Sequence, residues 1–172
     1  MDSFTSGYTI PLIVDIAVRQ TPGGPVVSWN DGNLEVVSLR ESGTNQLLPV
    51  PAGHAPLHFV WKTQHVYEIP KGYSAIATHP LNRFDLPFTT LSGIIDDFVV
   101  PPGNVPVFFS NTFEGVIPAG TPILQVIPFK QESWTNQTDE KLLQQARLNN
   151  FYSMRAAYGW YKKNIWKKKT FN

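Results

Sequence analysis

The 172-residue chain contains no cysteine, which excludes disulfide bonds, cysteine-based zinc sites and a thiol nucleophile. Charged residues are scarce at 16 %, whereas hydrophobic residues reach 42 % and suffice for one sizeable core. The longest apolar runs, such as Ile10–Val14 and Phe98–Val100, are far shorter than the roughly 20 residues that span a bilayer. The first residues show no secretory signal, which favours an intracellular origin. We therefore expect neither a membrane-spanning segment nor a membrane partner.

Proline and glycine, in contrast, are abundant, with 15 and 12 residues. They interrupt the chain too often for long helices and favour short strands joined by turns. Alternating apolar residues from Tyr8 to Val18 predict one half-buried strand, and the turn sequences that follow predict a meander of hairpins as far as Leu39. Further strands are expected at residues 57–61, 65–69, 74–78, 105–109, 115–117 and 123–129. The sequence thus predicts a mainly β protein.

The formal net charge of +1 conceals a strong asymmetry between two parts of the chain. Residues 1–134 carry six Lys or Arg against eleven Asp or Glu, a balance of −5. Residues 135–172 carry eight Lys or Arg against two acids, a balance of +6. We therefore predict a β-rich body at residues 1–134 and a C-terminal helix with a basic, aromatic tail at residues 135–172.

The C-terminal segment predicts a helix from Asp139 to Ile165, with Asn136 or Thr138 as the N-cap and acidic residues in the first turn. Five apolar residues recur at intervals of three and four and form one stripe: Phe151, Met154, Tyr158, Tyr161 and Ile165. Such a stripe requires a partner, because two heptads are too few for a free-standing coiled coil. The alternatives are the chain's own body, a second copy of the chain and another protein.

Basic and aromatic residues lie together near the C-terminus. They are Trp160, Tyr161, Lys162, Lys163, Trp166, Lys167, Lys168, Lys169 and Phe171. This cluster is suited to nucleic acid, through phosphate contacts and stacking, or to an acidic protein surface. A solvated terminus is the third alternative. Because the body is acidic, the tail of one copy is also suited to bind the body of another.

Several short motifs occur in a fixed order within residues 57–129. They are Gly93–Asp96, Asn111 at the end of a predicted strand, Gly120, and Ile123–Val126. Their order and spacing resemble the dUTPase and dCTP deaminase superfamily. The chain is still more similar to an uncharacterised family of tailed phages and some bacteria, through runs at residues 70–74, 80–83, 86–88, 93–96 and 119–130. The resemblance implies a dUTPase-like β-clip or jelly-roll-type fold of antiparallel sheets, assembled as a homotrimer.

The same resemblance implies catalytic roles that the rest of the sequence does not support. Asp96 would orient an attacking water, and Arg83 and His79 would lie near the substrate phosphates. However, residues 79–83 replace the Gly-Arg-Ser-Ser run of dUTPases, and the strand before Asn111 lacks the glutamate that a deaminase needs to move protons. The Gly-rich C-terminal arm of dUTPases is also missing. These departures predict a protein that is not an enzyme.

Two groups of residues are candidates for metal binding. The adjacent carboxylates of Asp96 and Asp97 are suited to a divalent ion such as Mg²⁺, although a solvated turn is the commoner role of such a pair. His54 and His58 have the spacing of helical metal ligands, but Pro56 between them disfavours a helix, so ordinary packing or surface histidines are expected. No cofactor is expected apart from Mg²⁺ in a catalytic alternative.

Together these inferences predict a structural or decorating, cement-type protein of a phage particle. A homotrimer would attach to other virion or capsid proteins through its C-terminal segment, after assembly in the host cytoplasm. The first alternative is a divergent Mg-dependent pyrimidine deoxynucleotide hydrolase that uses Asp96, Arg83 and His79. The second is an accessory protein that binds nucleic acid through its lysine-rich tail.

Overall fold

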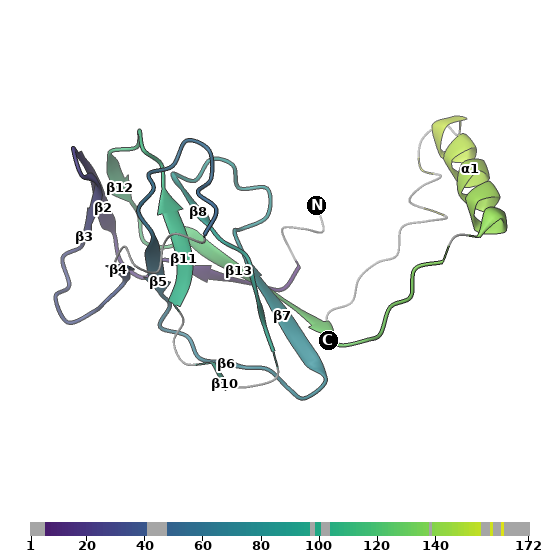
Figure 1. Cartoon of the computed structure of the whole chain (residues 1–172), viewed down its shortest axis with the longest axis horizontal. Coiled ribbons are helices and arrows are strands. Elements are labelled where there is room, and N and C mark those ends of the chain that lie inside the picture. The colour runs from purple at the N-terminus through teal and green to yellow at the C-terminus, as the bar shows by residue number, and fades with distance from the viewer. Residues whose placement is uncertain are drawn as a thin grey trace. The chain divides into compact units, whose positions relative to one another are not determined.

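The computed structural model describes residues 6–40, 48–96, 99–100, 104–137, 139–155, 159 and 163. Within these residues the chain forms thirteen strands and one helix, and every strand pair is antiparallel (Figure 1). The mainly β prediction is therefore confirmed. The chain divides into two compact units, Met1–Gln131 and Glu132–Asn172, a division three residues before the boundary expected from charge.

One four-stranded sheet joins segments that lie far apart in the sequence, in the order β1-β13-β7-β9. We call it the β13 sheet. Its strands are β1 (Tyr8–Pro11), β13 (Pro122–Lys130), β7 (Tyr73–Thr78) and β9 (Gly93–Ile95). Figure 1 shows β7 and β13 running side by side. The register places Ile127, Ile76 and Ile94 directly opposite one another across three strands.

The other strands of the body form two further sheets and a short ribbon. A four-stranded sheet has the order β4-β5-β11-β8 and is made of Val37–Leu39, Phe59–Lys62, Asn104–Phe109 and Phe88–Thr90. A three-stranded sheet has the order β12-β2-β3 and is made of Gly115–Ile117, Ile16–Thr21 and Gly24–Ser28. The ribbon pairs β6 (Tyr67–Glu68) with β10 (Val99–Val100).

The single strand predicted from Tyr8 to Val18 is wrong, because the chain changes sheets within it. β1 ends at Pro11 and pairs with β13, whereas β2 begins at Ile16 and pairs with β3 and β12. Between them, Leu12 exchanges backbone hydrogen bonds with residues 120 and 121, and the Asp15 carboxylate accepts the backbone N–H of Ala119 at 2.7 Å. The alternation of buried and exposed side chains nevertheless continues through this corner, since Leu12 and Ile16 are both buried in the core.

The predicted meander also ends earlier than expected. β2 and β3 form the predicted hairpin, but β4 pairs with β5 and not with β3. The turn sequence at residues 23–24 therefore located the reversal between β2 and β3 correctly, while the partner of β4 comes from a segment twenty residues further along the chain. Long-range burial, which turn chemistry does not encode, selects that partner.

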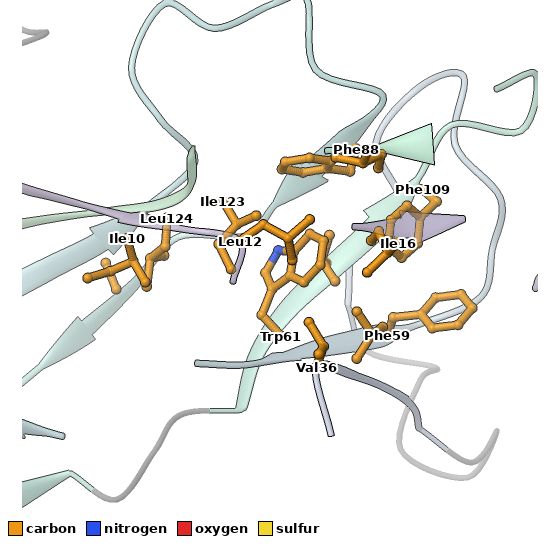
Figure 2. Packing of buried hydrophobic residues seen from close by; sticks show 14 of the residues in the cluster. Ile10, Leu12, Ile16, Val36, Phe59, Trp61, Phe88, Phe109, Ile123 and Leu124 are labelled. Atoms are coloured by element: carbon orange, nitrogen blue, oxygen red, sulfur yellow. The ribbon is translucent and has the colours of Figure 1, made fainter. Parts of the chain in front are cut away.

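Trp61 lies at the centre of the body's core and has no exposed surface. Its ring packs edge-on against Phe88 and Phe109, with centroids 5.1 and 5.6 Å away. Figure 2 shows these rings gathered with Leu12 and Ile16. The Trp61 Nε1–H donates to Thr90 Oγ1 at 3.0 Å, so the buried indole has a hydrogen-bond partner.

The second unit contains α1 (Glu140–Arg155). Its N-cap is Asp139, whose carboxylate accepts the backbone N–H of Lys141 at 2.8 Å. This corrects the prediction of Asn136 or Thr138 as the cap; Thr138 lies outside the described residues. A carboxylate at this position both satisfies a helix N–H and interacts favourably with the helix dipole. The predicted helix extends to Ile165, and most of its residues after Arg155 lie outside the described part of the chain.

Candidate functional site

Asp96 follows β9 and is tied to the neighbouring strand. The Ser74 hydroxyl on β7 donates to Asp96 Oδ1 at 2.9 Å. Gln131, at the end of β13, donates through its side-chain amide to Ser74 Oγ at 2.8 Å and to the Tyr73 carbonyl at 3.3 Å. Ser74 is buried, whereas Asp96 is exposed. One oxygen of the Asp96 carboxylate thus links the end of β9 to β7. Gln131, which follows β13, joins the same hydrogen-bond network through Ser74.

His79 lies just beyond the other end of β7. The backbone N–H of Thr90 donates to its Nδ1 at 3.3 Å, and its Nε2 lies 2.9 Å from the Arg83 carbonyl. Because Nδ1 accepts, we assign the proton to Nε2, which donates to Arg83. Both ring nitrogens therefore hold the loop at residues 79–83 in place. Asn82 in this loop adopts a positive φ of 63°, a conformation that asparagine tolerates better than most residues.

The guanidinium of Arg83 is held by a nearby carboxylate. Its Nε and a terminal nitrogen donate to the two oxygens of Asp85, each at 2.8 Å. These hydrogen bonds lower the pKa of Asp85 to about 2 and raise the pKa of Arg83. The two charges neutralise one another in a bidentate pair, which is the same geometry that arginine uses to bind phosphate. A phosphate would therefore compete with Asp85 for these two donors.

The fold separates the three candidate catalytic residues into two groups. Asp96 contacts Ser74 at the start of β7, whereas His79 follows Thr78 at its end. The five-residue interval from Ser74 to His79 corresponds to about 17 Å along an extended chain. Within one chain, His79 and Arg83 are thus brought together, but Asp96 is not brought to them.

Gln125 is a structural residue of this region that the sequence identified only as part of a motif. Its side chain is 2 % exposed and bridges two segments. Its Oε1 accepts the backbone N–H of Leu81 at 2.9 Å, and its Nε2 donates to the Ser6 carbonyl at 2.6 Å. A glutamine within the apolar run of β13 was the available signal, since a buried amide needs such partners.

Of the two candidate metal pairs, the structure describes both His54 and His58 but only Asp96 of the carboxylate pair. Within the described residues, no group of three or more His, Asp or Glu side chains is placed to hold an ion, and Asp97 lies outside them. His54 contacts the Thr89 hydroxyl at 3.0 Å, and His58 stacks on Phe108 with ring centroids 5.8 Å apart. Burial, with a smaller contribution from Arg40, lowers the pKa of His58.

Three of the thirteen stripe and cluster residues predicted in the C-terminal segment are described. Phe151 and Met154 lie on α1 with 47 % and 79 % of their surface exposed, and the exposed Lys163 donates its backbone N–H to Gly159 at 3.0 Å. The others lie outside the described residues: Tyr158, Trp160, Tyr161, Lys162, Ile165, Trp166, Lys167, Lys168, Lys169 and Phe171. No described helix is both long and apolar enough to cross a bilayer.

The body also carries an apolar surface that the sequence reasoning missed. We call it the outer isoleucine patch, and it consists of Ile76, Ile94, Ile127 and Phe129. Ile127, Ile76 and Ile94 form one row across the β13 sheet, and Phe129 lies in the next row, opposite Ser74. Ile94 is 66 % exposed, and Ile76 and Phe129 are each 38 % exposed. The nearly continuous apolar run of β13 was the available signal, because such runs indicate a strand that is apolar on both faces.

Compared with known protein families, curated proteins and solved structures, the chain matches none of them. The resemblance to the dUTPase and dCTP deaminase superfamily therefore stays a prediction.

Proposed function

We propose that the chain is a non-enzymatic structural or decorating protein of a phage particle, with a dUTPase-like fold, assembled as a homotrimer. One observation carries the proposal. Asp96, His79 and Arg83 are all engaged by the chain's own groups, and they lie at the two ends of β7. Residues that would act on a nucleotide thus serve in this chain to hold strands and a loop together.

The C-terminal unit is the proposed means of attachment. Apolar side chains are exposed along α1, and the sequence after the helix is rich in lysine and aromatic residues. This combination suits an acidic protein surface, through apolar contact supported by charge complementarity. The phage context comes from the motif resemblance, and with it the expectation that the protein resides in virions assembled in the host cytoplasm.

The first experiment asks whether the protein recognises a nucleotide. The purified chain is heated with deoxynucleoside mono-, di- and triphosphates, with and without Mg²⁺, and its mass is measured by light scattering on the same sample. We expect a trimer whose melting temperature does not change with any nucleotide. Stabilisation by several degrees with one pyrimidine nucleotide, lost in Asp96→Asn, would support the hydrolase and overturn the proposal.

The second experiment tests attachment. The tail lysines Lys162, Lys163, Lys167, Lys168 and Lys169 are replaced together by Gln, and the protein is mixed with particles of the phage that encodes it. We expect the wild-type chain to co-sediment with nuclease-treated particles and the variant to remain in solution. The control replaces the body lysines Lys71 and Lys130 and is expected to bind normally. Wild-type binding that nuclease treatment abolishes would instead indicate a nucleic-acid-binding protein.

A further inference from the structure

The outer isoleucine patch is an apolar surface of the body that does not pack into the body's own core. Its three isoleucines form a row that runs from β13 across β7 to β9, the last strand in the order of the β13 sheet. A soluble protein that exposes a contiguous apolar surface commonly uses it for binding. The carboxylate of Asp96 lies beside this row, because Ser74, opposite Phe129, donates to it.

The helix α1 carries a stripe with the complementary composition. Leu143, Arg147, Phe151 and Met154 follow one another at intervals of four, four and three residues, so they share one face of the helix. Leu143 is 48 % exposed and Met154 is 79 % exposed. Arg147 lies between the apolar residues and adds a positive charge. The stripe predicted from Phe151 onward therefore begins two turns earlier, at Leu143.

Charge indicates which surface this stripe binds. The body has a balance of −5, whereas α1 itself carries Lys141, Arg147 and Arg155 against Glu140, a balance of +2 without the lysine-rich tail. The body of another chain is thus an acidic partner for this helix. The 16-residue α1 is about 24 Å long, which is enough to cross the three strands of the row, whose outer members lie about 10 Å apart.

We propose that α1 of one copy docks on the outer isoleucine patch of a neighbouring copy. The apolar stripe of the helix covers the row of isoleucines, and Arg147 approaches the acidic edge marked by Asp96. Each chain then offers one helix and receives one, which is a head-to-tail contact that closes into a ring. The inference rests on the homotrimer of the proposed function and identifies the surfaces that form it, leaving the lysine-rich tail for attachment to the particle.

The test uses full-length variants in which only one of the two surfaces is damaged. Ile94→Asp damages the patch, and Leu143→Asp damages the stripe. Their matched controls are Val116→Asp, on an exposed edge strand of another sheet, and Leu148→Asp, on a different face of α1. Because the four side chains are between 48 % and 66 % exposed, folding should tolerate the changes, which circular dichroism verifies. Ile94→Ser serves as a milder replacement if Ile94→Asp misfolds.

Light scattering then measures the mass of each protein alone and of mixtures of two variants. We expect wild-type protein and both controls at three times the 19.3 kDa chain mass, and Ile94→Asp and Leu143→Asp at the mass of one chain. An equal mixture of these two variants retains one intact helix and one intact patch, and it is expected to form a dimer. Arg147→Glu should weaken the trimer at least tenfold, whereas Lys141→Glu, on another face of the helix, should not.

The remaining outcomes overturn the inference in distinguishable ways. A trimer that survives both Ile94→Asp and Leu143→Asp would leave the proposed function standing but place its contacts elsewhere. Monomeric variants whose mixture stays monomeric would show that the helix does not bind the patch of another copy. A wild-type monomer would overturn both this inference and the homotrimer of the proposed function.

Discussion

Tryptophan has opposite surroundings in the two units of the chain. Trp61 in the body is completely buried among aromatic rings, whereas Trp134 in the C-terminal unit is 87 % exposed. The same contrast holds for the aliphatic residues, since the body buries ten valines and isoleucines while the leucines of α1 are between 48 % and 66 % exposed. The body therefore has a core of its own, whereas the helix depends on its surroundings for stability.

Buried polar groups show the same difference. In the body, Gln125, Thr90 and Ser74 are each buried and each bridge segments distant in the sequence. On α1 the described side-chain hydrogen bonds are local, such as the one from Gln145 to Asn149 at 3.1 Å. The comparison indicates a body that is held together by its own core and a helix that has no core of its own, and four predictions test this contrast.

The largest effect is expected from removing the central aromatic ring. Trp61→Ala leaves a cavity beside Phe88 and Phe109 and deprives Thr90 of a donor, so it should lower the free energy of unfolding by about 3–5 kcal/mol. Urea denaturation measures the loss. Trp134→Ala is the matched control and should change stability by less than about 0.5 kcal/mol. Similar midpoints for the two variants would contradict the assigned core.

The second-largest loss of stability is expected from removing the buried side-chain amide of Gln125. Gln125→Met keeps the length of the side chain but leaves the Leu81 N–H and the Ser6 carbonyl without the partner that they have in the native protein. Each of the two lost hydrogen bonds contributes about 1 kcal/mol net, and we expect a loss of about 2 kcal/mol in urea denaturation. Gln144→Met on the exposed surface of α1 should have no measurable effect, and an equal loss there would argue against the contrast between the units.

A local effect is expected at the start of the helix. Asp139→Ala removes the N-cap of α1 and should destabilise the helix by about 1 kcal/mol. The ellipticity at 222 nm should decrease while the urea midpoint of the body stays constant. Asn136→Ala removes a residue that does not cap the helix and should leave the spectrum unchanged. A shift of the body midpoint would mean that the two units unfold together.

The smallest effect is expected from the pH response of a buried histidine. Burial lowers the pKa of His58 below its usual 6.5, so below that pH the unfolded chain binds this proton more readily than the folded chain does. The folded state should therefore lose stability as pH falls below 6.5. Denaturation at pH 7.5 and 5.5 should show a larger loss for the wild-type protein than for His58→Phe. Equal losses would assign the pH response to other groups.

The sequence alone was sufficient for part of the local structure of this protein. Alternation and turn residues predicted β7, β12 and β13 almost at their observed bounds. These features depend on neighbours along the chain, such as the two-residue period of a half-buried strand. The helix was also predicted, although its cap lay one or more residues away from the expected positions.

Only the tertiary structure decided which segments meet. The corner after Pro11 and the pairing of β4 with β5 both arise from contacts with distant strands. Asp96 could be proposed as a catalytic group from its motif, but its hydrogen bond to Ser74, 22 residues away, depends on the pairing of β7 with β9. The outer isoleucine patch depends on the register of three strands, and register is set by long-range burial rather than by local propensity.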